Sequence, residues 1–340
     1  MKEISWGILG TAGIAKKAML PALQNARGCH LSAIASRDLT RAEQVARQFG
    51  IPRAHGSYDA LLADSEVEAV YIPLPNHLHV PLTLRALAAG KHVLCEKPLA
   101  LTLAEARQVA DAAQAAGRVV AEAFMTRHHP QWQSARAFVR AGRIGRLTGV
   151  QAMFSYSNTD PENVRNQKDI GGGGLYDIGC YAIDAARFFF EAEPLSVTCT
   201  MDQDPRFGTD RLTTGAARFP GGGQLGFTVS TQGAMVQQLT LLGTAGYLVL
   251  DVPFNCPAGH NARLAIDRGD DLLGDGREVV VCPPADQYRL QAEAFVRAVT
   301  ENQPVPCILG NAAALEALTR AAQSGQWESL ADLTGPAGVD

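Results

Sequence analysis

In the first third of the chain, short apolar runs alternate with longer stretches whose apolar residues recur at helical spacing. We expect strands over Ile4–Leu9, Leu31–Ala35, Ala69–Ile72, His92–Leu94 and Val119–Ala121, and helices over Ile14–Asn25, Leu39–Phe49, Tyr58–Ala63, His79–Ala89 and Leu103–Ala116. Such strand–helix alternation predicts a parallel sheet with helices on both faces. Pro21 lies inside the first helical stretch and either kinks that helix or interrupts it.

Beyond residue 122 the pattern changes to alternating strand-like runs separated by glycine-rich turns. We expect strands over Leu147–Tyr156, Leu195–Met201, Thr214–Phe219, Gln224–Thr231, Gln237–Leu242 and Tyr247–Leu250, and helices over Gln131–Ala141, Gln287–Thr300 and Asn311–Gln323. Successive strands without intervening helices indicate a largely antiparallel sheet. The predicted fold class is α/β plus α+β: a Rossmann domain with a doubly wound parallel sheet over residues 1–122, and a second domain over residues 123–340 built on a large, mostly antiparallel sheet.

The 340 residues have the composition of an ordinary globular protein, with 46% hydrophobic residues, 19% charged residues and a net charge of -4. This balance predicts neither a nucleic-acid partner nor a membrane partner. The first residues lack the features of a signal peptide, so we expect a cytoplasmic protein. The seven cysteines are widely spaced and form no C-x-x-C motif, which argues against a disulfide framework and against a metal site.

The first apolar run leads into a degenerate form of the G-x-G-x-x-G fingerprint of dinucleotide-binding sites, formed by Gly10, Thr11, Ala12, Gly13, Ile14 and Ala15. Gly10 suits the tight turn, Ala12 replaces the second glycine, and alanine is tolerated at the third position. The following helix would offer its N-terminal N–H groups and positive dipole end to the phosphates. The alternative is a plain strand–helix turn.

The second strand ends in Ser36 and Arg37, where NAD-specific sites usually place an acidic residue for the ribose hydroxyls. A hydroxyl and a guanidinium suit a 2′-phosphate, which arginine binds through two parallel hydrogen bonds. The predicted cofactor is therefore NADP. NAD stays the alternative, because Asp38 follows one residue later. If the strand ended slightly later than expected, Asp38 would occupy the acidic position that favours NAD. Arg37 could then be no more than a solvated loop charge.

Two motifs carry a resemblance to a known family. The first comprises Leu74–His79 and Gly90–Pro98, and the second comprises Gly172–Asp184. Together they resemble the glucose–fructose oxidoreductase / inositol dehydrogenase family, and the resemblance covers nearly the whole chain. Tyr181 stands where many relatives have histidine, and the opening Trp6–Ala12 is similar to the branch that holds NADP-dependent D-xylose dehydrogenase and trans-dihydrodiol dehydrogenase.

This resemblance implies an oxidoreductase that acts on a small molecule, namely a sugar, a polyol or a cyclic diol. It implies that the second domain binds substrate and joins subunits into a homodimer or homotetramer. It also implies a structured turn at Lys97, with a cis Lys97–Pro98 bond. The expected cofactor-binding residues are the glycine turn Gly10–Ile14, Ser36, Arg37, Leu74, Pro75, Asn76, His79, Glu96, Lys97 and Arg127.

Arg127 and His79 also have other interpretations. Arg127 could equally be a surface arginine, and His79 could simply begin the following helix. His77 and His79 are separated by one residue, but they lack carboxylate or thiolate partners at the spacing that a metal site needs.

Oxidation of a hydroxyl needs a group that removes its proton while the hydride moves. Tyr181 is the candidate acid/base, although an ordinary tyrosine pKa of about 10 is too high for neutral pH. A nearby Lys97 ammonium would lower that pKa, unless Lys97 is only a solvated loop lysine. Asp177 lies four residues before Tyr181, so on a helix both point to one face, where Asp177 would bind substrate hydroxyls or hold Lys97. The glycines of Gly171–Gly174 either let the backbone pass close to a ligand or form a flexible turn.

We therefore predict an NAD(P)-dependent dehydrogenase or reductase acting on CH–OH groups, with Tyr181 as acid/base assisted by Lys97. Two alternatives stay open, a catalytically silent NAD(P)-binding sensor and an NAD-dependent glycosidase of the same family. The joint presence of Lys97 and Tyr181 favours an enzyme, because a sensor needs no proton machinery.

Overall fold

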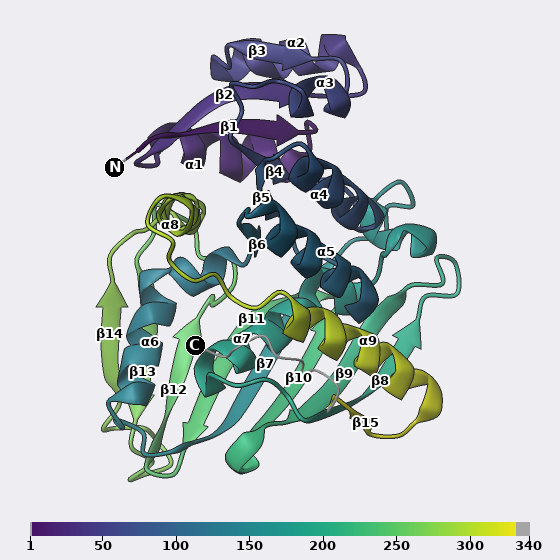
Figure 1. Ribbon diagram of the computed structural model, residues 1–340. Coiled ribbons are helices and arrows are strands. Elements are labelled where there is room, and N and C mark those ends of the chain that lie inside the picture. The colour runs from purple at the N-terminus through teal and green to yellow at the C-terminus, as the bar shows by residue number, and fades with distance from the viewer. Residues whose placement is uncertain (1, 331–340) are drawn as a thin grey trace. The chain divides into compact units, whose positions relative to one another are not determined.

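The computed structural model describes residues 2–330, which form two compact units (Figure 1). The first unit comprises the chain up to His128 together with Asp286–Ile308, and the second comprises His129–Ala285 and the chain from Leu309 onward. This grouping differs from the expected domains, 1–122 and 123–340, because a C-terminal segment joins the first unit. Residues 331–340 of the expected second domain lie outside the described residues.

The first unit contains a parallel six-stranded sheet, as the strand–helix alternation predicts. Its strands are β1 (Ile4–Leu9), β2 (Cys29–Ala35), β3 (Arg53–His55), β4 (Ala69–Ile72), β5 (His92–Cys95) and β6 (Val120–Glu122). They lie in the order β3-β2-β1-β4-β5-β6, and every neighbouring pair is parallel. This is the strand order of a Rossmann domain, in which the direction of strand addition reverses between β1 and β4.

The helices of this unit are α1 (Leu20–Asn25), α2 (Leu39–Phe49), α3 (Tyr58–Leu62), α4 (His79–Ala88), α5 (Leu103–Ala116) and α8 (Gln287–Thr300). A wider π-helical turn over Ala15–Met19 precedes α1, and Pro21 lies in the first turn of α1. Proline has no N–H and cannot donate the bond that a regular helix needs at that position. The irregularity expected at Pro21 thus takes the form of a π-helical turn that runs directly into α1.

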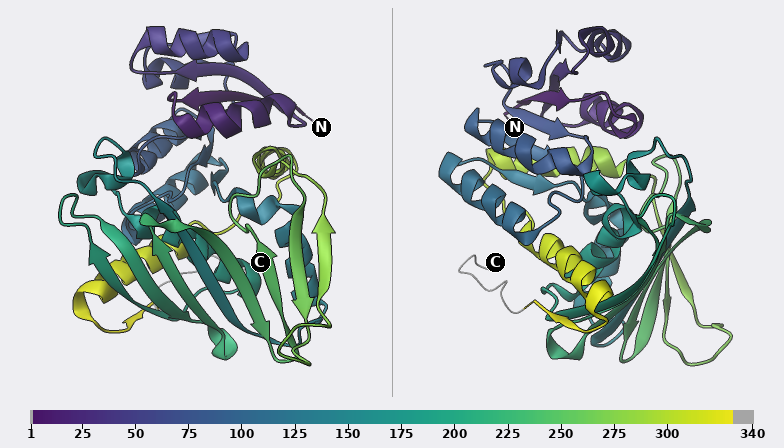
Figure 2. Two further views of the ribbon diagram at one scale, coloured as in Figure 1. Left: turned by 180° about the vertical axis from the view of Figure 1, so that it is seen from behind. Right: turned by 90° about the vertical axis from the view of Figure 1, so that its right-hand side faces the viewer.

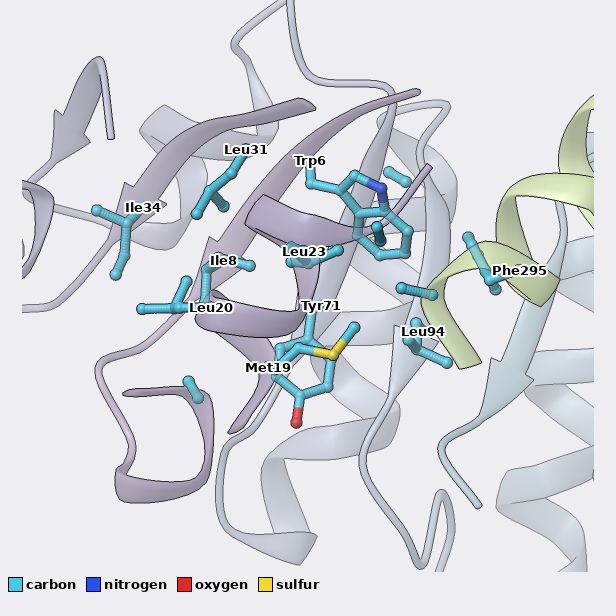
Figure 3. Close-up of a cluster of buried hydrophobic side chains, with 14 of the residues drawn as sticks. Trp6, Ile8, Met19, Leu20, Leu23, Leu31, Ile34, Tyr71, Leu94 and Phe295 are labelled. Carbon is cyan, nitrogen blue, oxygen red and sulfur yellow. The ribbon is translucent and has the colours of Figure 1, made fainter. Parts of the chain in front are cut away.

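A buried cluster explains why α8 belongs to the first unit (Figure 3). Trp6 of β1 is fully buried, and its ring centroid lies 5.1 Å from that of Phe295 on α8. Ala292 and Val296, on the same helix, are buried in the same cluster. Burying a large apolar side chain contributes about 1.5–3 kcal/mol. Helix α8 therefore stabilises the parallel sheet, although α8 is far from the strands of that sheet in the sequence.

The second unit is built on a nine-stranded sheet of β7 (Leu147–Ser157), β8 (Ser196–Gln203), β9 (Asp210–Arg218), β10 (Gln224–Ser230), β11 (Gln232–Gly243), β12 (Gly246–Asp251), β13 (Ala262–Asp267), β14 (Glu278–Cys282) and β15 (Glu328–Ser329). The strands lie in the order β14-β13-β12-β11-β7-β10-β9-β8-β15. Neighbouring strands are antiparallel except for β7 and β10. The predicted large, mostly antiparallel sheet is confirmed.

One face of this sheet is buried. Successive side chains of a strand point to opposite faces, so buried residues alternate with more exposed ones. On β10, for example, Leu225, Phe227 and Val229 are buried and the residues between them are partly exposed. The helices of the unit are α6 (Pro130–Arg140), α7 (Cys180–Phe190) and α9 (Leu309–Ser324), and they lie along the inner face. The view from behind in Figure 2 shows the outer face without a covering helix in the described part of this unit.

Candidate functional site

Four loops of the first unit follow the carboxyl ends of β1, β2, β4 and β5 and carry Gly10, Arg37, Asn76 and Lys97. Parallel strands all end at the same edge of their sheet, so these loops share that edge. In open α/β sheets, ligands bind at this edge where the strand order reverses. Arg127 lies in a short helical turn after β6. All the predicted cofactor-binding residues therefore belong to the first unit.

Gly10 makes a turn that a larger residue would not tolerate. Its φ is +109°, and a Cβ there would lie 2.6 Å from Leu74 Cδ2. Its N–H donates to the Ala35 carbonyl at 2.8 Å. Gly13 is exposed, with no atom within 4 Å of a Cβ placed on it, whereas Ala15 is fully buried. An exposed helix start next to a glycine turn offers N–H groups without intrahelical acceptors, so these residues fit a dinucleotide pyrophosphate.

The Asp38 carboxylate is engaged by the helix that follows it. Asp38 is the N-cap of α2, and its Oδ1 accepts the N–H of Arg41 at 3.3 Å. Ser36 is buried and its hydroxyl accepts the Asp38 N–H at 3.2 Å, while Arg37 is exposed. β2 ends at Ala35, so the register places Ser36 and Arg37 directly after the strand.

Tyr58, which sequence analysis missed, lies beside the same strand end. Its hydroxyl oxygen is 3.9 Å from a Cβ placed on Gly10. Burial raises the pKa of Tyr58, and the positive charge of Arg37 partly offsets that rise. Tyr58 is the first residue of α3, which begins after β3. No sequence motif signals that Tyr58 lies near Gly10, because its position depends on the path of the chain from β3 into α3.

The turn that carries Lys97 is held by carboxylates beneath it. Glu96 accepts the Tyr71 hydroxyl at 2.5 Å and the Lys97 N–H at 3.3 Å. Glu122 on β6 accepts another N–H of the same turn at 2.9 Å. The Lys97–Pro98 bond is cis. Lys97 itself is half-buried at the carboxyl end of β5.

His79 links this turn to the loop after β4. The side chain is buried, and its two ring nitrogens lie 2.7 Å from the carbonyl oxygens of Pro98 and Leu74. Burial lowers the pKa of His79 to about 4, so the neutral ring donates to one of these carbonyls at physiological pH. His79 thus points into the protein, while Pro75 and Asn76 lie at partly exposed positions of the loop.

Asp177 and Tyr181 lie on one continuous helix of the second unit. Asp177 is in a π-helical turn over Leu175–Gly179 that runs directly into α7, and Tyr181 is the second residue of α7. Residues four apart on a helix share one side. Only 5% of Tyr181 is exposed, and its ring centroid lies 5.8 Å from that of Phe154 and 5.6 Å from that of Phe254. Such apolar neighbours disfavour a phenolate, so a basic role for Tyr181 requires a nearby positive charge.

Asp177 has partners that sequence analysis missed. Its Oδ2 accepts the Tyr156 hydroxyl at 2.6 Å and lies 2.8 Å from Arg165 Nε. Burial and the negative charge of Asp177 raise the pKa of Tyr156 far above its ordinary value, so this hydroxyl stays protonated and donates. Arg165 lies in a segment without helical or strand periodicity, and Tyr156 lies near the end of β7, so no sequence pattern signals that the two side chains meet at Asp177.

The glycines ahead of this helix make room for a buried carboxylate. Asp210, the first residue of β9, accepts the Leu175 N–H at 2.7 Å and the Thr213 hydroxyl at 2.6 Å. Gly173 has a φ of +120°, and a Cβ there would overlap Asp210 Oδ1. The Gly171–Gly174 run therefore lets the backbone pass close to Asp210, at the start of the helix that carries Asp177 and Tyr181.

Asp210 also makes the stability of the protein depend on pH. Burial raises its pKa to about 6, against 3.8 for the unperturbed group. A raised folded-state pKa contributes stability that is present below the unfolded pKa and is lost as pH rises through the folded pKa. Between pH 5 and pH 7.5 the unfolding free energy of the wild type should fall by about 1 kcal/mol relative to Asp210→Asn. Urea unfolding at both pH values measures this, and a difference independent of pH would contradict it.

The described residues contain no group of three or more His, Cys, Asp or Glu side chains arranged to hold a metal ion. None of the described helices combines the length and the apolar character that crossing a membrane requires.

Residues 4–124 match the family described as "Oxidoreductase family, NAD-binding Rossmann fold", and residues 132–249 match the GFO/IDH/MocA C-terminal domain. The chain is 46% identical to an uncharacterized oxidoreductase from Rhizobium meliloti over 334 residues, which cover 97% of this chain and 100% of the relative. The protein belongs to the GFO/IDH/MocA family. It is an NAD(P)-dependent oxidoreductase, and the family and fold class expected from the sequence are both confirmed.

Two further proteins are similar along most of the chain. A D-xylose 1-dehydrogenase (NADP(+)) from Haloferax volcanii is 40% identical over 296 residues, covering 86% of this chain and 88% of the relative. The solved structure of a 3-ketoreductase from Actinomadura kijaniata with NADP and TDP-benzene has a TM-score of 0.87 at 31% identity, covering 94% of this chain and 98% of that one. Solved structures of that ketoreductase include variants in which one lysine or one tyrosine is replaced.

Proposed function

We propose that this oxidoreductase transfers a hydride between NADP and a sugar, a polyol or a cyclic diol, with Tyr181 as the acid/base. The observation that carries the proposal is the strand order of the first unit, which gathers Gly10, Arg37 and Lys97 at the ligand-binding edge of a Rossmann sheet. When bound, the nicotinamide accepts or donates the hydride, while the protein orients the substrate and moves the proton.

The preference for NADP rests on the end of β2. The Asp38 carboxylate caps α2, so it serves the helix rather than a ribose. Arg37 is exposed directly after the strand, beside the hydroxyl of Ser36, and both suit a 2′-phosphate. The D-xylose dehydrogenase relative is named for NADP, and the 3-ketoreductase was solved with it.

The proton step is assigned to Tyr181 and Lys97. The aromatic neighbours of Tyr181 oppose its ionisation, and an ammonium near the hydroxyl would lower its pKa toward neutral pH. Lys97 is held by a turn whose backbone is fixed through Glu96 and Glu122, which is the rigidity that a positioned charge needs. Asp177 is proposed to orient substrate hydroxyls from the helix that carries Tyr181.

Assembly is proposed to use the outer face of the large sheet. The strand register places Met153, Leu242, Val279 and Val281 on this face, and all four are exposed. Exposed apolar side chains on an uncovered sheet face suit a subunit interface, so we expect a homodimer or homotetramer. All seven cysteines are free, which fits the reducing cytoplasm that we propose as the location.

The function is tested by following NADPH absorbance in both directions, with NAD(H) in parallel. Aldoses, inositols and a trans-cyclohexadiene diol serve as substrates for oxidation, and a 3-keto sugar serves for reduction. The proposal predicts turnover with one of these classes and a preference for NADP. Tight NADPH binding without turnover of any class would contradict it, as would glycoside cleavage without net change of NADPH.

A further inference from the structure

Arg165 is a positive charge that a loop of the second unit brings to Asp177. It lies in a short helical turn over Val164–Asn166, between β7 and the helix that carries Asp177 and Tyr181. Its Nε is 2.8 Å from Asp177 Oδ2, and its side chain is 43% exposed, against 12% for Asp177. The Tyr156 hydroxyl donates to the same carboxylate oxygen. The three side chains thus form one ion-paired cluster, which we call the Arg165 cluster.

The backbone around Arg165 is fixed as firmly as its side chain. The Arg165 carbonyl accepts the Gly173 N–H at 2.8 Å. A Cβ on Gly172 would lie 2.6 Å from the same carbonyl oxygen and 2.6 Å from that of Gln167. Glycine is therefore needed for the loop to pack against the start of the helix. This packing ties the position of Arg165 to the helix that presents Tyr181.

Three ionisable groups act on this guanidinium, and a fourth acts on one of them. Asp177 and Tyr181 face it from the helix and Tyr156 faces it from β7, while Asp210 on β9 acts on Tyr156. The negative charge of Asp177 raises the pKa of Arg165, so Arg165 is positively charged at every physiological pH. Asp177 alone would oppose ionisation of Tyr181, because a like charge disfavours a phenolate. The Arg165 charge opposes that effect, because an opposite charge favours the ionised form.

We propose that Arg165 is a positioning residue for proton transfer, which pairs with Asp177 and balances its charge so that Tyr181 can ionise. The inference rests on the proposed role of Tyr181 as acid/base. In this proposal, Arg165 contributes a second positive charge besides that of Lys97. The charge of Arg165 also explains why the Asp177 carboxylate can lie on the same side of the helix as Tyr181, which must lose its proton. Arg165 acts through Asp177 and Tyr181 and needs no contact with the substrate.

The test measures the ionisation of Tyr181 directly. The full chain is labelled with ¹³Cζ-tyrosine, and the Tyr181 signal among the seven tyrosines is identified by its loss in Tyr181→Phe. In Arg165→Gln, the pKa of Tyr181 should rise by about one pH unit, the lower end of the effect of a nearby opposite charge, since Arg165 is partly solvated. Circular dichroism restricts the titration to pH values at which each variant is folded.

The chain offers a matched control on β12–β14. Arg277 pairs with Asp267, and the Tyr247 hydroxyl donates to the same carboxylate oxygen, so this cluster has the same three residue types as the Arg165 cluster. Arg277 is also 43% exposed. Arg277→Gln should leave the Tyr181 titration unchanged. Arg165→Lys keeps the charge and should restore most of the shift that Arg165→Gln produces.

A double variant separates charge balance from packing. Asp177→Asn alone should lower the Tyr181 pKa, and Arg165→Gln combined with Asp177→Asn should bring it back close to the wild-type value. If the Tyr181 pKa does not move in Arg165→Gln, or if the double variant keeps the full shift, the positioning role is wrong. The Tyr181 titration needs neither cofactor nor substrate, so its outcome is independent of the turnover assay. A wild type that turns over no substrate overturns the proposed function, whatever the tyrosine titration shows.

Discussion

Tyr181→Phe should lower kcat by about 100-fold or more in the direction that the panel identifies, the usual size of lost general acid–base catalysis. The substitution removes only the hydroxyl, so the ring can keep its contacts with Phe154 and Phe254. The binding of NADPH, followed by its fluorescence, should stay close to that of the wild type, because the predicted cofactor residues all belong to the other unit. Steady-state kinetics with saturating substrate measures the effect.

Tyr247→Phe is the matched control for this variant. The Tyr247 hydroxyl donates to Asp267, so this substitution also removes one tyrosine hydroxyl from a carboxylate-rich part of the same unit. Its kcat should equal that of the wild type. Unchanged turnover in Tyr181→Phe, or an equal loss in both variants, would remove Tyr181 from the proton step.

Arg37→Ala should weaken NADPH binding by about 10- to 100-fold, which corresponds to losing hydrogen bonds between an arginine and a charged phosphate. NADH binding should change little, because NADH has no 2′-phosphate. The dissociation constants of both cofactors, measured by fluorescence titration, give the comparison. The loss for NADPH should also shrink at high salt, since Arg37 is exposed and its charge is screened there.

Arg47→Ala is the control for Arg37. Arg47 lies in the last turn of α2 and pairs only loosely with Glu43, at 3.8 Å. Its removal should leave both dissociation constants unchanged. An equal loss of NADPH and NADH binding in Arg37→Ala would mean that Arg37 supports the fold of the strand end rather than the 2′-phosphate, and the NADP assignment would fail.

Hydrophobic periodicity predicted the regular elements that carry the site well, because those elements are buried and long enough to show a pattern. β1, β2 and α2 appear close to their expected limits. β3 was missed, because Arg53–His55 contains no apolar run and pairs with β2 through only three residues. β13 and β14 were also missed, since the pairing of these two strands toward the edge of the sheet depends on tertiary contacts.

The candidate site divides in the same way. The placement of Gly10, Arg37 and Lys97 at strand ends could be predicted from sequence, because each lies within two residues of a recognisable strand. The contacts that Arg165 and Tyr156 make with Asp177 could not be predicted. They depend on the tertiary course of the loop that carries Arg165, which has no helical or strand periodicity. The Gly171–Gly174 run shows the limit most clearly. Its glycines signal a close approach, but only the structure identifies the Asp210 carboxylate and the Arg165 carbonyl as the groups approached.

The proposed reaction moves a hydride between a sugar-like hydroxyl carbon and NADP. The most direct test uses the substrate class that the panel identifies, deuterated at the carbon to be oxidised, and determines by mass spectrometry where the deuterium goes. Direct hydride transfer predicts that one deuterium appears in the NADPH formed for each substrate oxidised. Deuterium that is lost to water, or product that forms without labelled NADPH, would contradict direct hydride transfer and the function proposed here.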